Sequence, residues 1–221
     1  MSNCVRCNVC QNPGSLESAT ETLKVPCHVR CFKDDYFTVW RCNNCGSLHS
    51  MEDVDLDKYY SKYPLQNHKL DFHTRCGYEN RLNLLKKAGV QADHSILDFG
   101  CGQGLYVDFL SQHGFKNVSG YDPYNPALND PAVLSKQYDV VVNHDVIEHV
   151  PDPSTTFNQW VSLVKPGGWL VIGTPNAAEI SLKRKKRSDF TTSGALTTLP
   201  PPYSFAASID WISQSSGIES Y

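Results

Sequence analysis

A short apolar strand that runs into alternating glycines is the feature that most constrains how this chain can fold. Residues 96–104 read Ile-Leu-Asp-Phe-Gly-Cys-Gly-Gln-Gly, and a helix-like segment, residues 105–113, follows. A second apolar strand, residues 118–122, ends in Asp122. Strand, glycine-rich turn, helix, strand and acid in this order are typical of a nucleotide-type cofactor site in a doubly wound α/β sheet.

The glycines explain why such a turn can accept a ligand. Glycine has no Cβ, so a ligand can approach the main chain closely and the backbone can adopt positive φ. The turn leads into a helix start, where backbone N–H groups have no helical partner. Asp122, at the carboxyl end of the second strand, can accept hydrogen bonds from a ribose diol. A tight turn that packs helix on strand without a ligand is the alternative.

The glycine spacing differs from that of dinucleotide-binding folds, which carry Gly-x-Gly-x-x-Gly. This chain has Asp98-x-Gly100-x-Gly102-x-Gly104. That pattern resembles motif I of the class I S-adenosylmethionine-dependent methyltransferases.

The resemblance extends over roughly residues 95–177, in the order of the family's elements. Residues 138–142 resemble the fourth strand, and residues 145–153 resemble the segment that follows it. Residues 163–172 resemble a helix end, a turn and the fifth strand, and residues 174–176 resemble the loop after it.

The resemblance implies a mostly parallel, doubly wound, Rossmann-like sheet that binds S-adenosylmethionine. The cofactor-binding residues that it implies are Asp98, Gly100, Gly102, Gly104, Asp122, Asn143 and His144. The main hypothesis is methyl transfer to O or C of a small molecule, such as a sugar, a quinone or a secondary metabolite. Two alternatives stay open: an RNA or protein methyltransferase that grips its substrate with the cysteine-rich region, and a cofactor-binding module without catalysis.

Three polar residues after the fourth strand are candidates for the chemistry. Asp145, Glu148 and His149 are spaced i, i+3 and i+4, so a helical turn would place them on one face. Two carboxylates and an imidazole can bind a divalent ion or transfer a proton. The spacing resembles that of the O-methyltransferases of ubiquinone biosynthesis, which implies Mg²⁺ at these residues and catalytic roles for Glu148 and His149. The alternative is that Glu148 and His149 only orient the loop.

Cysteines predict a second site, because seven of the nine lie within the first 45 residues. Cys42-x-x-Cys45 with a following glycine is a knuckle that can place two thiolates on one metal ion. For the second pair we favour Cys7 and Cys10, on their resemblance to a zinc-ribbon-like region that precedes the domain in some bacterial members. We therefore expect a structural Zn²⁺, because so short a segment has little core of its own.

Other cysteine arrangements stay open. Cys4 and Cys7 form an overlapping pair, and Cys27 or Cys31, which flank His28, can supply a ligand. Small buried thiols without a metal ion are the remaining alternative.

The predicted organisation is a ribbon at residues 1–50, a linker at 51–68 and a methyltransferase domain at 69–221. A helix is expected over residues 69–88, ending at Gly89. The linker tyrosines are expected either to cover the cofactor or to pack on the next helix; they are Tyr59, Tyr60 and Tyr63.

Composition limits the setting. A net charge of −3 gives no global basic field for nucleic acid. No apolar run is long enough to span a bilayer, and the N-terminus lacks the apolar segment of a signal peptide. The chain is therefore expected in the cytoplasm, where cysteines stay reduced. The residues do not indicate an oligomeric state.

Two regions depart from the family pattern. Residues 123–137 are too short for the usual helix, so the third strand is expected to shrink to 132–134, with adenine contacted by Asp130, by nearby backbone or by an apolar wall alone.

The second departure is at the C-terminal end. The basic run 183–187 is expected to be a solvated face or a substrate lid, or else an import signal or phosphate-binding patch, and 188–206 a mobile loop. A helix is expected over 208–214, and a sixth strand can begin only at Ile218. The C-terminal strands are therefore expected to be incomplete. Either the sequence is part of a longer chain, or the fifth strand is left as a sheet edge that can pair with another chain.

Overall fold

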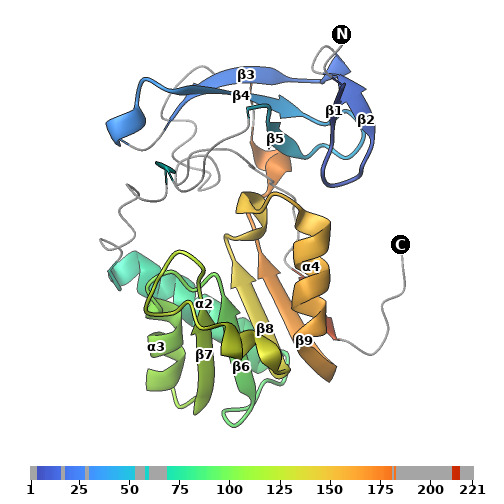
Figure 1. Ribbon diagram of the computed structural model, residues 1–221. Coiled ribbons are helices and arrows are strands. Elements are labelled where there is room, and N and C mark those ends of the chain that lie inside the picture. The colour runs from blue at the N-terminus through green and yellow to red at the C-terminus, as the bar shows by residue number, and fades with distance from the viewer. Residues whose placement is uncertain are drawn as a thin grey trace. The chain divides into compact units, whose positions relative to one another are not determined.

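The computed structural model describes residues 4–15, 18–27, 30–52, 58–59, 69–180, 182 and 211–214 (Figure 1). Contacts between residues divide the chain into two compact units. The ribbon unit comprises Met1–Tyr63, Asp145–Phe157 and Thr174–Ile209. The sheet unit comprises Pro64–His144, Asn158–Gly173 and Asp210–Tyr221.

The sheet unit is built on a five-stranded sheet with the order β10-β9-β8-β6-β7. Its strands are β6 (Ser95–Phe99), β7 (Asn117–Tyr121), β8 (Tyr138–His144), β9 (Val164–Gly173) and β10 (Trp211–Gln214). The pairs of β6 with β7, β6 with β8 and β8 with β9 are parallel, and β10 is antiparallel to β9. The predicted doubly wound, mostly parallel sheet is confirmed.

Among the described residues, α-helices lie before β6, between β6 and β7, and between β8 and β9. They are α2 (Phe72–Lys87), α3 (Leu105–Gln112) and α4 (Pro153–Ser162). Helix α2 begins at Asp71, whose side chain accepts a hydrogen bond from Thr74 N at 2.8 Å, and Gly89 beyond its end has a φ of 88°. In the described part of the chain, no helix combines the length and the apolar character needed to cross a membrane.

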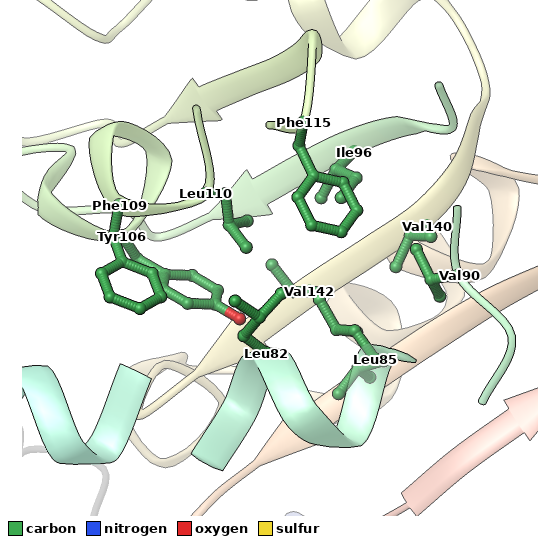
Figure 2. Close-up of a cluster of buried hydrophobic side chains, with 11 residues drawn as sticks. Leu82, Leu85, Val90, Ile96, Tyr106, Phe109, Leu110, Phe115, Val140 and Val142 are labelled. Atoms are coloured by element: carbon green, nitrogen blue, oxygen red, sulfur yellow. The ribbon is translucent and has the colours of Figure 1, made fainter. Parts of the chain in front are cut away.

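The core of the sheet unit lies where α2 and α3 pack against the central strands (Figure 2). Leu82 and Leu85 of α2 share the cluster with Phe109 and Leu110 of α3. The strands contribute apolar side chains that include Ile96 of β6 and Val140 and Val142 of β8. Near-continuous apolar runs of this kind are typical of parallel strands, which are buried on both faces.

The ribbon unit carries two small antiparallel sheets. One pairs β1 (Cys4–Arg6) with β2 (Pro13–Ser15), and the other has the order β3 (Thr22–Pro26), β4 (Tyr36–Arg41) and β5 (Leu48–Ser50). A 3-10 helix, η2, spans Arg30–Phe32.

Tyr59, one of the three linker tyrosines, packs on the ribbon rather than at either place expected from the sequence. Its ring lies 4.7 Å from that of Phe32 and 5.8 Å from that of Phe37, centroid to centroid. Its hydroxyl donates a hydrogen bond to Asp35 Oδ2 at 2.5 Å. The other two, Tyr60 and Tyr63, lie outside the described residues.

The predicted third strand at 132–134 is wrong, because a 3-10 helix, η4, occupies Pro131–Ser135. Pro131 opens it with a fixed φ, and the Asp130 side chain accepts a hydrogen bond from Ala132 N at 2.9 Å. This local capping replaces strand pairing. The expected loss of the helix between β7 and β8 is confirmed, since residues 122–137 contain no α-helix.

The helix predicted over 208–214 is wrong at residues 211–214. There β10 pairs with β9 from Trp211 opposite Ile172 to Gln214 opposite Trp169. An unpaired strand edge leaves a row of N–H and C=O groups without partners, and this pairing satisfies them. Strand β9 is therefore not the open edge that the sequence predicted. The basic run 183–187, the loop 188–206 and Ile218 lie outside the described residues.

Candidate active site and metal centre

The turn between β6 and α3 takes a conformation that requires glycine. Gly100, Gly102 and Gly104 have φ values of 80°, 56° and 75°, in the region that side chains disfavour. A Cβ added at Gly102 would meet no atom within 4 Å, so open space lies against the main chain there. At Gly104 an added Cβ would lie 3.3 Å from Leu128 Cδ1. The turn is thus bare toward solvent at its centre and packed at its helical end.

Asp122, directly after β7, connects the second strand to this turn. Its Oδ2 accepts a hydrogen bond from Gly102 N at 2.8 Å, and its Oδ1 accepts one from Tyr124 N at 2.9 Å. Burial raises the pKa of this carboxyl above its ordinary value, although these N–H donors oppose the rise. A carboxylate offers about four lone-pair positions, so two such bonds do not exhaust its capacity to accept more.

Asp98 places a second carboxyl near the carboxyl end of β6. Its side chain is buried, and this desolvation raises its pKa to about 7, with the Arg81 charge opposing the rise and the Asp122 charge adding to it. An ammonium group brought next to Asp98 would favour the ionised form. Asp98 can therefore pair with a cationic group.

Asn143 and His144 end β8 with two buried atoms that have no hydrogen-bond partner among the described residues. Asn143 Nδ2 donates to Phe99 O at 3.2 Å, while Asn143 Oδ1 and His144 Nδ1 are unpartnered. Burial, helped by the Arg81 charge, lowers the pKa of His144 to about 3, so its ring is neutral at neutral pH. Buried polar atoms without partners are uncommon in proteins, so these two suit a polar ligand.

Glu148 and His149 lie in the ribbon unit, in the 3-10 helix η5 (Ile147–His149). Thr174 Oγ1 donates a hydrogen bond to Glu148 Oε2 at 3.2 Å, and His149 Nε2 lies 3.8 Å from Glu148 Oε1. Burial, helped by the Asp145 charge, raises the pKa of Glu148 to about 8, and burial lowers the pKa of His149 to about 3. Both groups are therefore mainly uncharged at neutral pH.

Four cysteines of the ribbon unit gather at one point. Their sulfur atoms all lie within 4.8 Å of one another; the residues are Cys7, Cys10, Cys42 and Cys45. Cys7 Sγ lies 3.7 Å from Cys45 Sγ, and Cys10 Sγ lies 3.8 Å from Cys42 Sγ. Tetrahedral zinc with Zn–S bonds of about 2.3 Å would separate its sulfurs by about 3.8 Å. The donor set and its spacing therefore fit Zn²⁺.

Comparison with known proteins identifies the family. The model of the Methyltransferase domain family matches residues 70–212. The chain belongs to this methyltransferase family.

Two curated relatives are similar over part of this methyltransferase. It is 33% identical over 119 residues to the ubiquinone biosynthesis O-methyltransferase of Serratia proteamaculans (strain 568), covering 43% of this chain and 49% of that protein. It is 29% identical over 118 residues to the enzyme of the same name from Hydrogenovibrio crunogenus (strain DSM 25203 / XCL-2), covering 43% and 48%. The methyltransferase spans about half the length of these relatives.

A solved structure with weaker similarity is the N-methyltransferase NodS from Bradyrhizobium japonicum WM9 in complex with S-adenosyl-L-homocysteine. Its sequence identity is 20%, its TM-score is 0.39, and the match covers 57% of this chain and 70% of that chain. A similarity at this level carries no conclusion about substrate.

The Mg²⁺ site predicted for this methyltransferase is not supported. Asp145 has a φ of 58° and precedes η5, so Asp145, Glu148 and His149 do not share the helical turn that the spacing predicted. Across the described residues, the cysteine cluster is the one group of three or more Asp, Glu, His or Cys side chains whose ligand atoms gather closely enough for a metal ion.

Sequence reasoning missed two residues beside the cysteine cluster. Ser47 Oγ lies 2.9 Å from Cys45 Sγ, and His49 Nε2 lies 3.2 Å from Cys7 Sγ. Such contacts orient thiolate ligands and modulate their charge. Their position just after the second knuckle, two residues apart along an extended segment, was the available signal. Cys27, an alternative ligand, packs instead with Phe37 and Tyr59.

Proposed function

We propose that this methyltransferase binds S-adenosylmethionine and transfers its methyl group to an oxygen or carbon of a small molecule. Membership of the methyltransferase family supports methyl transfer, and the relatives named for ubiquinone biosynthesis favour an oxygen acceptor on a quinol-like ring. The observation that carries the proposal is the open glycine turn at Gly102, with the buried carboxyls of Asp98 and Asp122 beside it.

In this proposal the sheet unit holds the cofactor. Asp98 accepts from the ammonium group, Asp122 from the ribose hydroxyls, and the bare backbone at Gly100, Gly102 and Gly104 allows close approach. Asn143 Oδ1 and His144 Nδ1, which lack partners within the described chain, are proposed to contact the amino-acid end. When bound, the cofactor supplies a methyl group activated by the positive charge on its sulfur.

The acceptor side is proposed to lie with Glu148 and His149. A hydroxyl acceptor must lose its proton as the methyl group arrives, and a neutral imidazole can take it. The pKa of His149, lowered by burial, keeps the ring neutral at neutral pH. Glu148 lies beside it, and its carboxylate form, which predominates above its raised pKa of about 8, can stabilise the imidazolium that forms.

The cysteine cluster is proposed to hold a structural Zn²⁺. We retain residues 1–50 as the zinc ribbon, 51–68 as a linker and 69–221 as the methyltransferase domain. A four-thiolate zinc site needs reduced cysteines, so the proposed setting is the cytoplasm.

The test combines calorimetry with a transfer assay on the zinc-loaded chain. S-adenosylmethionine and S-adenosylhomocysteine should each bind at one site per chain, and Asp122→Asn should weaken binding by about 10- to 100-fold, the scale of a lost charge-assisted hydrogen bond. Asp93→Asn is the matched control, because Asp93 is exposed and precedes β6, at the opposite end of that strand from the glycine turn.

Transfer of radiolabelled methyl is then measured to 3,4-dihydroxybenzoate, to a quinol and to a nucleotide sugar. Incorporation into one of these supports a small-molecule acceptor. Absence of cofactor binding by folded, zinc-loaded protein would contradict the proposal.

A further inference from the structure

The ribbon unit brings together three segments that are far apart in the sequence. These are the cysteine-bearing sheets, the residues after β8 and the residues after β9. We infer that Arg41, on β4, is a positioning residue that connects the second cysteine knuckle to the segment after β9 and thereby holds Glu148 in place. The positioning role rests on the proposed function, because Glu148 is a candidate catalytic residue there.

Arg41 makes an unusual number of hydrogen bonds for one side chain. Its Nε donates to Glu21 Oε2 at 2.9 Å, and its Nη1 donates to Gly46 O at 2.8 Å and to Ala177 O at 3.0 Å. Its Nη2 donates to Ile180 O. Only 15% of the side chain is exposed, so these bonds are little weakened by water. A planar guanidinium can satisfy several acceptors at fixed positions, which a lysine cannot do.

One of these acceptors belongs to the metal knuckle. Gly46 follows Cys45 directly and adopts a φ of 76°, and its N–H donates to Cys42 O at 3.0 Å. The carbonyl that Arg41 binds is therefore fixed by the same turn that presents Cys42 and Cys45 to a metal ion. Release of the metal should free this turn, and with it one end of the Arg41 contact.

The other end is a short segment that also packs on the ribbon through apolar side chains. It contains the 3-10 helix η6 (Ala177–Glu179), and Ala177, Ile180 and Leu182 share a buried cluster with Val39 of β4 and Leu48 of β5. Apolar packing is non-directional, so it holds the segment against the sheet without fixing its exact position along the sheet. The hydrogen bonds from Arg41 to the carbonyls of Ala177 and Ile180 fix that position.

Glu148 is reached from this segment through Thr174. Thr174 Oγ1 donates to Glu148 Oε2 at 3.2 Å, three residues before Ala177. On the first knuckle, Asn8 Nδ2 donates to Pro151 O at 3.5 Å, two residues after His149. The first knuckle thus contacts chain next to the candidate acid-base pair directly, and the second is linked through Arg41 to the segment that carries Thr174.

Hydrogen exchange on the intact, zinc-loaded chain tests this inference without an acceptor. The reporters are the amides of Ala178, bonded to Asn176 Oδ1 at 2.9 Å, and Ile180, bonded to Ala177 O at 3.2 Å. Arg41→Gln should accelerate their exchange at least about tenfold, because local opening becomes easier. Lys24→Gln is the control, since Lys24 is an exposed cation on β3 of the same sheet.

If Arg41→Gln folds poorly, two further samples are measured by hydrogen exchange in its place. Arg41→Lys keeps the charge beside Glu21 and should still accelerate exchange, and removal of zinc from the wild type with a chelator should do the same. Unchanged exchange at Ala178 and Ile180 in both conditions would overturn the inference.

The pKa of Glu148, measured by NMR, shows whether Arg41 positions this side chain or only stabilises the segment after β9. Carboxyl ¹³C NMR, with Glu148→Gln for assignment, should place the pKa of Glu148 near 8 in the wild type. In Arg41→Lys that pKa should fall toward the ordinary value of about 4.3, because loss of burial removes the main cause of the shift. Asp145 and His149 face the same group, so Asp145→Asn is measured alongside. An unmoved pKa would contradict the positioning role.

Cofactor binding gives an independent check. S-adenosylhomocysteine affinity should change less than about twofold in Arg41→Lys, because Asp98 and Asp122 belong to the sheet unit. Failure of the wild type to bind this ligand would refute the proposed function alone. The exchange rates at Ala178 and Ile180 would still decide whether Arg41 holds the segment.

Discussion

The sheet unit and the ribbon unit of this chain are stabilised by different interactions. In the sheet unit one contiguous cluster spans two helices and three strands, with Ile96, Phe109 and Leu110 fully buried. In the ribbon unit the apolar clusters hold only a few buried residues each, and two of the three buried members of one are Cys7 and Cys42. A small region with so little apolar burial needs additional links, and here the cysteine cluster and the Arg41 hydrogen bonds are placed to supply them.

Loss of a metal ligand should unfold the ribbon unit and leave the sheet unit folded. Cys42→Ser, or chelation of the wild type, should abolish order in the ribbon unit, because structural zinc contributes about 10–16 kcal/mol of apparent binding free energy in small domains. The sheet unit should keep its secondary structure and bind S-adenosylhomocysteine. Zinc content and hydrogen exchange measure the two effects. Cys31→Ser is the control, because Cys31 is exposed and lies outside the cluster. Joint collapse of both units would refute the distinction.

Truncation of a buried side chain in the core of the sheet unit should instead destabilise the sheet unit. Leu85 is 1% exposed within the α2 contact to the sheet, so Leu85→Ala should lower the free energy of unfolding by about 2–5 kcal/mol. Leu84→Ala, next to it on the same helix but 47% exposed, should cost less than about 1 kcal/mol. Urea denaturation followed by far-ultraviolet circular dichroism measures both. Equal losses would show that burial does not stabilise this unit.

Substitution of the candidate acid-base pair should separate chemistry from cofactor binding. Glu148→Gln and His149→Asn should each lower kcat by about 100-fold, the lower range for general acid-base catalysis, with cofactor affinity unchanged. Asp152→Asn is a matched control, because Asp152 is exposed and bonds only locally to Thr155. Steady-state kinetics provide the values, with whichever acceptor takes up label in the transfer assay proposed above. Full turnover by both variants would leave the pair with a purely structural role.

The smallest expected effect concerns pH and Asp98. Burial raises the pKa of Asp98 to about 7, so the folded state holds this proton more tightly than the unfolded state does. The contribution of this group to stability is therefore fully present below about pH 4 and is lost as pH rises through about 7. Asp98→Asn should remove this loss, so the variant should gain on the order of 2 kcal/mol relative to the wild type between pH 5 and 8. A constant difference in unfolding free energy across that range would contradict the raised pKa.

Local sequence signals were enough to predict the glycine turn of the sheet unit and the helices and strands next to it. The glycine pattern at 100–104, the acid at Asp122 and the helix expected over 69–88 are each determined by neighbouring residues and by helical or strand periodicity. The structure forms the turn, the strands and the helix at those positions. The four favoured cysteines also meet, because a knuckle is a local structure and only its pairing is non-local.

The remaining features depend on partners that are distant in the sequence. Residues 211–214 form a strand because β9 offers an edge, and nothing in their own composition requires it. Asp145 leaves the expected helical turn because its backbone adopts positive φ. Arg41 was visible only as one cation among twenty Lys and Arg residues, and its acceptors Ala177 and Ile180 lie well over one hundred positions away.

The most direct test of the division between the two units is ¹H–¹⁵N NMR of the zinc-loaded chain titrated with S-adenosylhomocysteine. We predict saturable shifts at the amides of Gly100, Gly102, Gly104 and Asp122, with the amides of Cys10 and Cys45 unmoved. Shifts confined to the cysteine knuckles, or none at the glycine turn of a folded protein, would contradict it.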